Sequence, residues 1–363
     1  MRRKKYFKIL KAVLLSFVSL LLCAVLAFYV LIVFGASKRL QTMWVCSAMT
    51  TMYHKYLATW FFTDEEIDKI MSENYVDDSE YDSSMTDFNK NEIVFHKPTL
   101  LEKLLTKDRS SVQAPDWFNS YIIEGYHELE DGIFLKEVSG TSWKGYVMLI
   151  ENPMRVKLLD TQYQFDKGQT VKRMVTNSGA IAGLNGGGFV DGANYDSNGG
   201  TPAGLVIENG TLISPIQESE IENKRYSMIG INSKGVLVLK HCTPKWALEN
   251  DIVSAVSFSP FIVVNGEGTV KNGTGGWGLA PRTAIGQRAT GEFLFLVIDG
   301  RQIGWSIGCD LDVLQEVLLN EKAENGAMLD GGSSTVLFYR GDYINRPSLG
   351  HERLINNCFI VTE

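Results

Sequence analysis

An uncharged apolar run near the N-terminus places the strongest constraint on this chain. Residues 12–36 read AVLLSFVSLLLCAVLAFYVLIVFGA and contain no charged side chain. A helix of about 20 such residues crosses the roughly 30 Å hydrocarbon core of a bilayer, so we expect a transmembrane helix here. A cleaved signal peptide is the alternative, but its apolar region usually spans only about 7 to 15 residues. The length of the run and the missing small-residue cleavage site favour a retained anchor.

Charge fixes the expected orientation and excludes one class of partner. Six basic residues lie before the run: Arg2, Arg3, Lys4, Lys5, Lys8 and Lys11. The positive-inside rule therefore predicts a cytoplasmic tail at 1–11 and an extracytoplasmic remainder, although Lys38 and Arg39 reduce the asymmetry. The net charge of −7 argues against nucleic acid as a partner. The five cysteines show no C-x-x-C spacing and indicate neither a disulfide framework nor a zinc site.

The chain after the anchor divides by pattern into three parts. Apolar residues at helical spacing between Trp44 and Trp60, and a Thr63-x-x-Glu66 capping box, predict a helical stem at 37–72. The stem either packs on the main domain or binds a membrane surface or partner. Residues 73–119 begin with a run rich in Asp, Glu, Ser and Asn and are interpreted as a solvated linker and connection.

Residues 120–363 have the pattern of an α+β domain. Short apolar runs alternate with turn signals such as Asn209-Gly210 and 233–235, which predict hairpins. Helical periodicity is confined to about 168–178 and to 310–322, where Asp310 is a suitable N-cap and Gly326 a suitable end signal. Several strands for each helix predict a mainly antiparallel sheet packed with a few helices.

A run of three glycines is the first candidate for a binding site. Residues 183–189 read GLNGGGF and follow an apolar segment. Consecutive glycines are costly in backbone entropy, so the run indicates either a positive φ or the close approach of the main chain to a ligand. Asn185 offers a donor and an acceptor for a hydroxyl or a phosphoryl oxygen, and Gly187 offers a main-chain contact. A tight turn in which Asn185 bonds its own backbone is the alternative.

Two arginines and two aspartates follow strand-like runs in the last third of the chain. Arg282 comes after Pro281 in PRTAIG, and Asp299 and Arg301 flank a glycine after the apolar run 292–298. Guanidinium groups in these places can bind a phosphate in bidentate fashion. Surface ion pairs are the alternative interpretation.

The run LDGGSS at 329–334 is the sharpest signal. It places Asp330 at a strand end, and amides of Gly331, Gly332, Ser333 and Ser334 after it can form a nest for an oxyanion. The run is not a nucleophile elbow, because no G-x-S-x-G is present.

Two other signals carry less weight. The match to G-x-G-x-x-G at 273–278 neither follows a strand nor opens a helix, so a dinucleotide site is excluded and a rim loop with Trp277 available to stack on a sugar is expected. His351 is a weak acid/base candidate. No metal spacing demands a cation, although a divalent ion bridging Asp299 and Asp330 fits the residue types. We therefore expect no cofactor.

Taken in order, six motifs resemble the phosphodiester glycosidase family. They are NGGGF at 185–189, PRTAIG at 281–286, DGR at 299–301, the helix after Gly308, LDGGSS at 329–334, and NRP at 345–347 with Glu352-Arg353. The resemblance covers about residues 120 to 363. The basic tail, single span and stem are similar to those of bacterial membrane-anchored members linked to exopolysaccharide synthesis.

The resemblance implies hydrolysis of a sugar-1-phosphate diester at the glycosidic C1–O bond in the cell envelope. On this hypothesis Arg282 and Arg301, with Arg353, hold the phosphate. Asp330 or Asp299 is the nucleophile or the base, and Asn185, Ser333 and Ser334 orient hydroxyls and oxyanions. A non-catalytic glycan-binding module and a glycosyl or sugar-phosphate transferase of polysaccharide or teichoic acid assembly are the alternatives. The sequence gives no indication of the sugar or of the oligomeric state.

Overall fold

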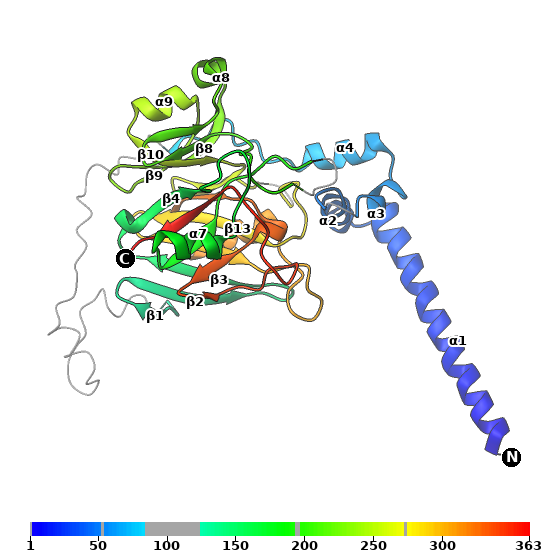
Figure 1. Ribbon diagram of the computed structural model, residues 1–363. Helices are drawn as coiled ribbons and strands as arrows, with labels where there is room; N and C mark the ends of the chain where they lie inside the picture. The colour runs from blue at the N-terminus through cyan, green and yellow to red at the C-terminus, as the bar shows by residue number, and fades with distance from the viewer. Residues whose placement is uncertain (1, 52–53, 84–123, 193–196, 272–273) are drawn as a thin grey trace, which may run out of the picture. The chain divides into compact units, whose positions relative to one another are not determined.

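The computed structural model describes residues 2–51, 54–83, 124–192, 197–271 and 274–363. They form two compact units, an N-terminal unit of residues 1–75 with 272–278, and a C-terminal unit of residues 76–271 with 279–363. The predicted segments 98–119 and 121–123 lie outside the described residues. Figure 1 shows the elements of each unit.

The N-terminal unit is helical and begins with the apolar run. Its elements are α1 (Arg2–Phe28), the π-helix η1 (Tyr29–Val33), α2 (Lys38–Met49), α3 (Tyr56–Thr59) and α4 (Asp64–Glu73). Among the described residues one helix, Tyr6–Val33, is long and apolar enough to cross a membrane. Its length and composition suit a membrane anchor or a signal sequence.

The stem differs from its prediction in one place and agrees in another. The helical pattern between Trp44 and Trp60 is interrupted, because α2 ends at Met49 and the Thr50 hydroxyl bonds back to the Cys46 carbonyl at 2.7 Å. The capping box is confirmed: the Glu66 amide donates to Thr63 Oγ1 at 3.3 Å, and the Thr63 amide donates to Glu66 Oε2 at 2.9 Å.

The glycine-rich loop that was predicted to be a flexible rim packs instead with the stem. Thr50 Oγ1 donates to the Trp277 carbonyl at 3.0 Å. A Cβ on Gly278, whose φ is +61°, would lie 2.2 Å from the Ser47 amide nitrogen. Glycine is needed for both reasons, so this sequence signal reports a close packing contact with α2.

Three antiparallel sheets build the C-terminal unit. The eight-stranded sheet has the order β1 (His127–Glu130), β2 (Ile133–Ser139), β3 (Lys144–Ile150), β14 (Phe293–Ile298), β13 (Arg282–Arg288), β15 (Ala323–Met328), β11 (Phe261–Val264) and β12 (Glu267–Gly268). The second has the order β7 (Thr211–Ser214), β6 (Val206–Glu208), β10 (Ile252–Ser257), β8 (Tyr226–Asn232) and β9 (Leu237–Cys242). The third has the order β17 (Asp342–Tyr343), β16 (Leu337–Tyr339), β5 (Ala182–Asn185), β18 (Asn357–Val361) and β4 (Val156–Asp160).

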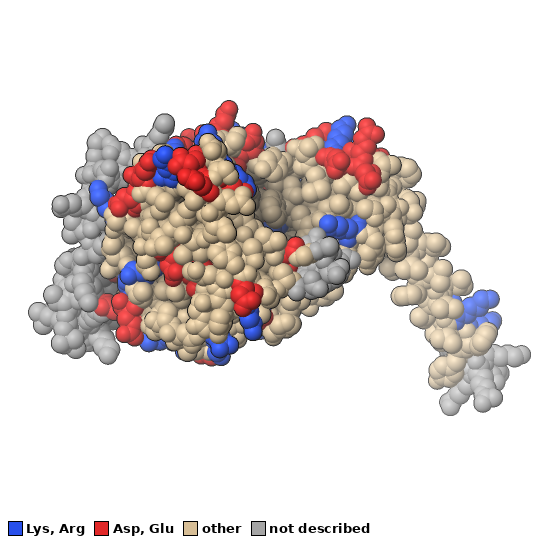
Figure 2. Space-filling model, turned by 45° about the horizontal axis from the view of Figure 1, so that its top comes forward, with Lys and Arg blue, Asp and Glu red and all other residues tan. Residues whose placement is uncertain are grey.

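Short helices complete this unit, and the α+β prediction is confirmed. They are η4 (Pro153–Arg155), α7 (Val171–Ser178), α8 (Glu218–Asn223), α9 (Pro244–Glu249), α10 (Leu311–Asn320) and η5 (Gly332–Ser334). Side chains from all three sheets share one apolar core, which includes Leu184, Ile229 and Phe295. The second sheet with α8 and α9 lies at one end of the unit (Figure 1), and Figure 2 shows acidic and basic side chains interspersed there.

Helix α10 packs on the part of the large sheet formed by β15, β11 and β12. Asp310 caps it as predicted, with Oδ1 accepting from the Val313 amide at 3.1 Å. Gly326 does not end the helix, because it lies in β15 opposite Gly286 of β13. A Cβ on either glycine would lie 3.1 to 3.3 Å from Leu318 of α10. The paired glycines therefore let this helix approach the sheet.

The described part of the acidic run is not solvated throughout, because two of its polar residues, Asp78 and Ser83, are buried. Asp78 is buried, and its Oδ2 accepts from the Phe261 amide at 2.9 Å. Its Oδ1 lies 3.3 Å from His241 Nε2. Ser83 Oγ accepts from the Leu239 amide at 2.6 Å. These bonds attach the segment to β9 and β11, which charge composition alone does not reveal.

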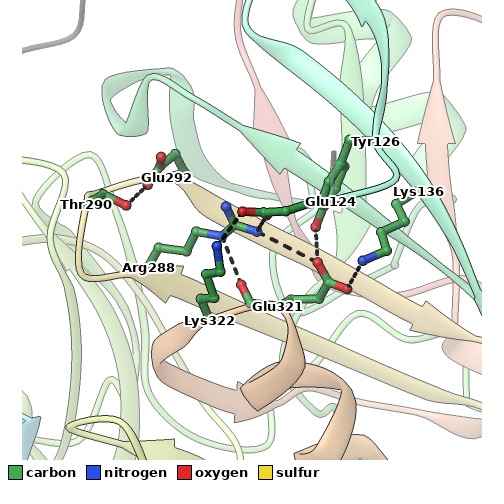
Figure 3. A network of polar contacts seen from close by, with 8 residues as sticks. All are labelled: Glu124, Tyr126, Lys136, Arg288, Thr290, Glu292, Glu321 and Lys322. Atoms are coloured by element: carbon green, nitrogen blue, oxygen red, sulfur yellow. Dashed lines mark hydrogen bonds and ion pairs between the residues drawn. The ribbon is translucent and has the colours of Figure 1, made fainter. Parts of the chain in front are cut away.

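A polar network fixes the end of β13 that lies opposite Arg282 (Figure 3). Arg288 Nη2 donates to Glu124 at 2.8 Å, and Arg288 Nε donates to the Glu321 carbonyl at 2.8 Å. The Glu321 carboxylate accepts from Tyr126 at 2.7 Å and from Lys136 at 2.6 Å. The network joins the start of the sheet to the end of α10, so this arginine of β13 is structural.

Candidate active site

Two arginines meet where β13 begins and β14 ends. Arg282 is the first residue of β13 and is buried, and its Nε donates to the Cys309 carbonyl at 3.2 Å. Burial lowers the pKa of Arg282 to about 10, and the nearby charge of Arg301 acts in the same direction. Two nearby positive charges repel each other, so an anion bound at this end of the sheet would be stabilised.

Arg301 reaches the site from an uncommon backbone conformation. Its φ is +61°, which costs of order 1 kcal/mol or more in a residue with a Cβ. The conformation is held by a bond from its amide to the Ile307 carbonyl at 3.0 Å. Loss of hydration lowers the pKa of the Arg301 guanidinium, and the Asp330 carboxylate opposes this change. Among the described residues no carboxylate forms an ion pair with Arg301 within 4 Å.

The turn after β15 brings Asp330 beside these arginines. The Asp330 amide donates to the Gly186 carbonyl at 3.1 Å, and the Gly332 amide donates to the Pro281 carbonyl at 2.9 Å. Gly332 has a φ of +60°, and a Cβ there would lie 3.4 Å from the guanidinium nitrogens of Arg301. A Cβ on Gly331 would lie 2.9 Å from the Pro281 carbonyl oxygen. Both glycines therefore bring this turn close to the residues that flank Arg282.

Asp330 has the properties of a carboxylate that gains and loses a proton near neutral pH. Burial raises its pKa to about 6, and the Ser334 hydroxyl, the charge of Arg353 and the Gly331 amide act against this rise. Asp191 contributes to the rise. Ser333 and Ser334 are both buried in η5, and Ser334 is the one that bonds Asp330.

Asn185 and Gly187 have partners inside the protein. Asn185 Nδ2 donates to the Asp330 carbonyl at 2.6 Å, and its Oδ1 accepts from Thr283 Oγ1 at 2.9 Å and from the Val336 amide at 3.0 Å. The Gly187 amide donates to Asn357 Oδ1 at 2.9 Å. These contacts position Asn185 and Gly187 within the protein, and their ligand contacts stay a prediction. The glycine run permits a close approach of protein to protein, since a Cβ on Gly187 would lie 2.9 Å from Val256 Cβ.

Asp299 holds the loops around Arg301. Its carboxylate accepts from Trp305 Nε1 at 2.8 Å, from the Arg346 amide at 2.9 Å and from Asn345 Nδ2 at 3.1 Å. Burial raises the pKa of Asp299, and these three donors oppose the rise. The centre of the Trp305 ring lies 3.5 Å from Arg346 Cζ and 3.9 Å from Lys144 Nζ. A carboxylate occupied by three protein donors is suited to a positioning role.

The charge of Arg353 also acts on Asp330, and Arg353 is paired with a residue that the sequence analysis missed. Its Nη2 is 2.6 Å from both carboxylate oxygens of Asp191. Its guanidinium is 4.7 Å from the Phe189 ring centre. Asp191 comes two residues after the NGGGF run, and that proximity is the signal that could have found it.

Among the described residues no group of three or more His, Cys, Asp or Glu side chains is arranged to hold a metal ion. The three protein donors on Asp299 also leave little capacity for a cation to bridge it to Asp330. The site thus combines two clustered arginines, one carboxylate with a near-neutral pKa and a third arginine neutralised by its own partner.

The residues of this site lie in a segment that matches the model of a known protein family. The model of the phosphodiester glycosidase family matches residues 178–362, just over half of the chain, and the match includes every candidate residue. The SPbeta prophage-derived uncharacterized protein YomE of Bacillus subtilis (strain 168) is 39% identical over 82 residues, which are 23% of this chain and 13% of that protein. The chain thus matches only a small part of this curated relative.

One solved structure supports the fold. The zebrafish N-acetylglucosamine-1-phosphodiester α-N-acetylglucosaminidase catalytic domain, auto-inhibited by its pro-peptide, aligns with a TM-score of 0.51 and 20% identity over 65% of this chain and 85% of that chain. A hypothetical protein from Synechocystis aligns with a TM-score of 0.47 and 16% identity over 65% of this chain and 63% of that one.

Proposed function

Because the chain belongs to the phosphodiester glycosidase family, we propose that it hydrolyses a sugar-1-phosphate diester at the C1–O bond. The products are a free sugar and a phosphate monoester. The observation that carries the proposal is the gathering of Arg282, Arg301 and Asp330 at one end of the large sheet, where the charge of Arg301 acts on Arg282 and that of Asp330 acts on Arg301. The zebrafish structure is titled as an enzyme of N-acetylglucosamine-1-phosphodiesters, which makes this sugar the first substrate to test.

The two arginines supply the phosphate site. Burial disfavours the charged forms of Arg282 and Arg301, and the charge of Arg301 also disfavours that of Arg282, so a bound phosphodiester would relieve both effects. The N–H donors of the Arg301 guanidinium can bind the phosphate, because the side chain forms no ion pair among the described residues. Bidentate bonds from a guanidinium would orient the phosphate and leave the sugar toward Asp330.

Asp330 supplies the base. A carboxylate with a pKa of about 6 is largely ionised at neutral pH and can still accept a proton readily. Water adds to C1 while the C1–O bond breaks, the proton of the water passes to Asp330, and the bonding electron pair leaves with the phosphate oxygen. The second pKa of a phosphate monoester is about 6, so the leaving group needs little acid assistance. The arginines stabilise the charge that develops on it.

We also propose a location for the reaction. The length of the apolar helix Tyr6–Val33 supports a retained anchor, and the basic residues before it support a cytoplasmic N-terminus. The catalytic unit then lies outside the cytoplasm at the membrane surface. Sugar phosphates of the cell envelope or of exopolysaccharides are the substrates within its reach.

The experiment uses the full chain in detergent and the methyl diester of N-acetylglucosamine-1-phosphate. We expect free sugar and methyl phosphate as products, and a loss of about a hundredfold to ten-thousandfold in turnover for Asp330→Asn, the range typical of a general base. The matched control is Asp312→Asn, which changes an exposed carboxylate on α10 and should leave turnover unchanged.

Three results would contradict the proposal. They are absence of turnover with this diester and with nucleotide diesters, full activity of Asp330→Asn, and loss of activity in Asp312→Asn. Transfer of the sugar to an added alcohol in preference to water would instead identify a transferase.

A further inference from the structure

The stem packs beside the last turns of the apolar helix. The ring centre of Trp44 in α2 lies 4.9 Å from that of Phe28, and the ring centre of Phe61 lies 5.0 Å from it. Gln41 Nε2 donates to the Ile32 carbonyl at 3.0 Å. All of these residues belong to the N-terminal unit. The depth of the last helical turns in a membrane therefore sets the depth of the stem.

The length of the helix places these turns at the level of the lipid headgroups. Tyr6–Val33 has 28 residues. At 1.5 Å per residue such a helix measures roughly 42 Å. The hydrocarbon core of a bilayer is about 30 Å thick, and the bilayer with its headgroup regions is about 40 to 45 Å thick. A helix of this length reaches the headgroups on both sides, so Phe28 and Ile32 lie close to one boundary between acyl chains and headgroups.

Two aromatic side chains of the stem are exposed at this level. Trp60 is 72% exposed and Tyr56 is 41% exposed, and their ring centres are 4.9 Å apart. Trp60 directly precedes Phe61, so its Cα lies about 3.8 Å from that of a residue packed on Phe28. Phe34, which follows the helix, is 79% exposed. Tryptophan and tyrosine are the residues that concentrate at membrane–water boundaries, because each has an apolar ring and a polar tip.

The acidic helix of the stem lies on the other side of the stem core. Figure 1 shows α2 and α3 between the end of α1 and α4. The first turn of α4 carries Asp64, Glu65 and Glu66. Ile67 of α4 is buried in the stem core, and Glu65 lies about 200° around the helix from it. The stem thus presents aromatic side chains near the end of the apolar helix and carboxylates on its far side.

We propose that Trp60 and Tyr56 bind the bilayer boundary at which the apolar helix ends. The inference goes beyond the proposed hydrolysis and rests on the retained anchor of the proposed location. The partner is the lipid surface itself, because an indole N–H and a phenol O–H can bond headgroup oxygens while the rings contact acyl chains. The two side chains fix the depth of the stem, so the chain that follows it starts at a defined level above the membrane.

The test measures the tryptophan fluorescence of the full chain in nanodiscs that hold one chain each. The discs contain phosphatidylcholine brominated near the headgroup end of its acyl chains, and parallel samples receive acrylamide as an aqueous quencher. The signal of Trp60 is the difference between the wild-type chain and Trp60→Phe. It should lose most of its intensity with the brominated lipid and little with acrylamide. Quenching by acrylamide alone, or by neither reagent, would overturn the proposal.

A matched control moves the tryptophan to the acidic side of the stem. In Trp60→Phe/Glu65→Trp the new indole should respond to acrylamide and not to the brominated lipid. Quenching of this indole by the lipid would contradict the orientation of the stem. Discs that hold two chains test a second copy of the chain as the occupant. Protection of Trp60 from the lipid in those discs would assign the aromatic surface to that copy and overturn the proposal.

Failure of this inference is distinguishable from failure of the proposed function. Hydrolysis of the methyl diester by the same discs tests the C-terminal unit, and the quenching of Trp60 does not depend on it. Hydrolysis without quenching of Trp60 by lipid would contradict the membrane contact alone. Quenching by lipid without hydrolysis would contradict the proposed reaction alone. A chain that separates from the discs in size-exclusion chromatography would contradict the retained anchor, and the membrane contact with it.

Discussion

The side-chain amide of Asn185 donates a 2.6 Å hydrogen bond to the main-chain carbonyl of Asp330. The same side chain accepts from Thr283 and from the Val336 amide. One buried amide therefore connects β5, β13 and the segment that precedes β16 directly to the backbone of the proposed base. Its role is to fix the position of Asp330.

Asn185→Ala should damage both stability and catalysis. The substitution leaves the buried Val336 amide and the Asp330 carbonyl without these partners, which costs about 1 to 3 kcal/mol for each unsatisfied group. We expect the free energy of unfolding in urea to fall by about 2 to 4 kcal/mol. Because Asn185 acts through Asp330, kcat should fall more than KM rises. An unchanged kcat in a folded variant would contradict the positioning role.

Gly332→Ala should weaken phosphate binding. The new methyl group meets the Arg301 guanidinium at 3.4 Å and sits on a backbone with a φ of +60°. The backbone strain alone costs of order 1 kcal/mol. Gly210→Ala is the matched control, because Gly210 has a φ of +74° and a Cβ there would have no neighbour within 4 Å. We expect equal losses of stability, with a raised KM for the diester only in Gly332→Ala. An equal KM in the two variants would contradict the placement of Arg301 in the phosphate site.

Asp299→Asn should show whether Asp299 or Asp330 is the catalytic carboxylate, a choice that the sequence leaves open. The carboxylate of Asp299 accepts three hydrogen bonds, and the NH2 group of an asparagine would face some of the same donors. The free energy of unfolding should therefore fall by about 1 to 3 kcal/mol. Turnover should fall far less than in Asp330→Asn when both are measured at a temperature at which the variants stay folded. A larger loss in Asp299→Asn would assign the catalytic carboxylate to Asp299.

The raised pKa of Asp330 should appear in the pH dependence of stability. Folding raises this pKa from 3.8 to about 6, so between these values the folded chain holds a proton that the unfolded chain has released. The contribution of Asp330 to stability therefore decreases as pH rises from about 4 to 6, by about 2 to 3 kcal/mol in total. Urea unfolding of the wild-type chain and of Asp330→Asn over this range checks the sign. A difference that grows in favour of the wild-type chain with rising pH would contradict it.

The local signals in the sequence identified much of this arrangement. Strand-end glycines and charges pointed to Arg282, Arg301 and Asp330, and helix-capping residue types pointed to Thr63 and Asp310. These features depend on chemistry within a few residues of one another, which a sequence displays directly.

Long-range pairings could not be predicted in the same way. Asp191 and Arg353 are 162 residues apart, and Asp78 reaches Phe261 across 183 residues. Nothing near Asp78 in the sequence distinguishes it from a solvated acid, because its partners come from other strands. The NGGGF run shows the same limit: its glycines were expected to allow a ligand to approach the main chain, and the neighbours that the structure places against Gly187 are protein atoms.

The measurement that tests the central claim most directly is hydrolysis of the N-acetylglucosamine-1-phosphate methyl diester in water enriched in ¹⁸O. Cleavage of the C1–O bond leaves the bridging oxygen on the phosphate, so the methyl phosphate released by the full chain should carry no ¹⁸O, and its formation should require Asp330. Methyl phosphate or sugar phosphate that carries ¹⁸O would show attack at phosphorus and would contradict the account.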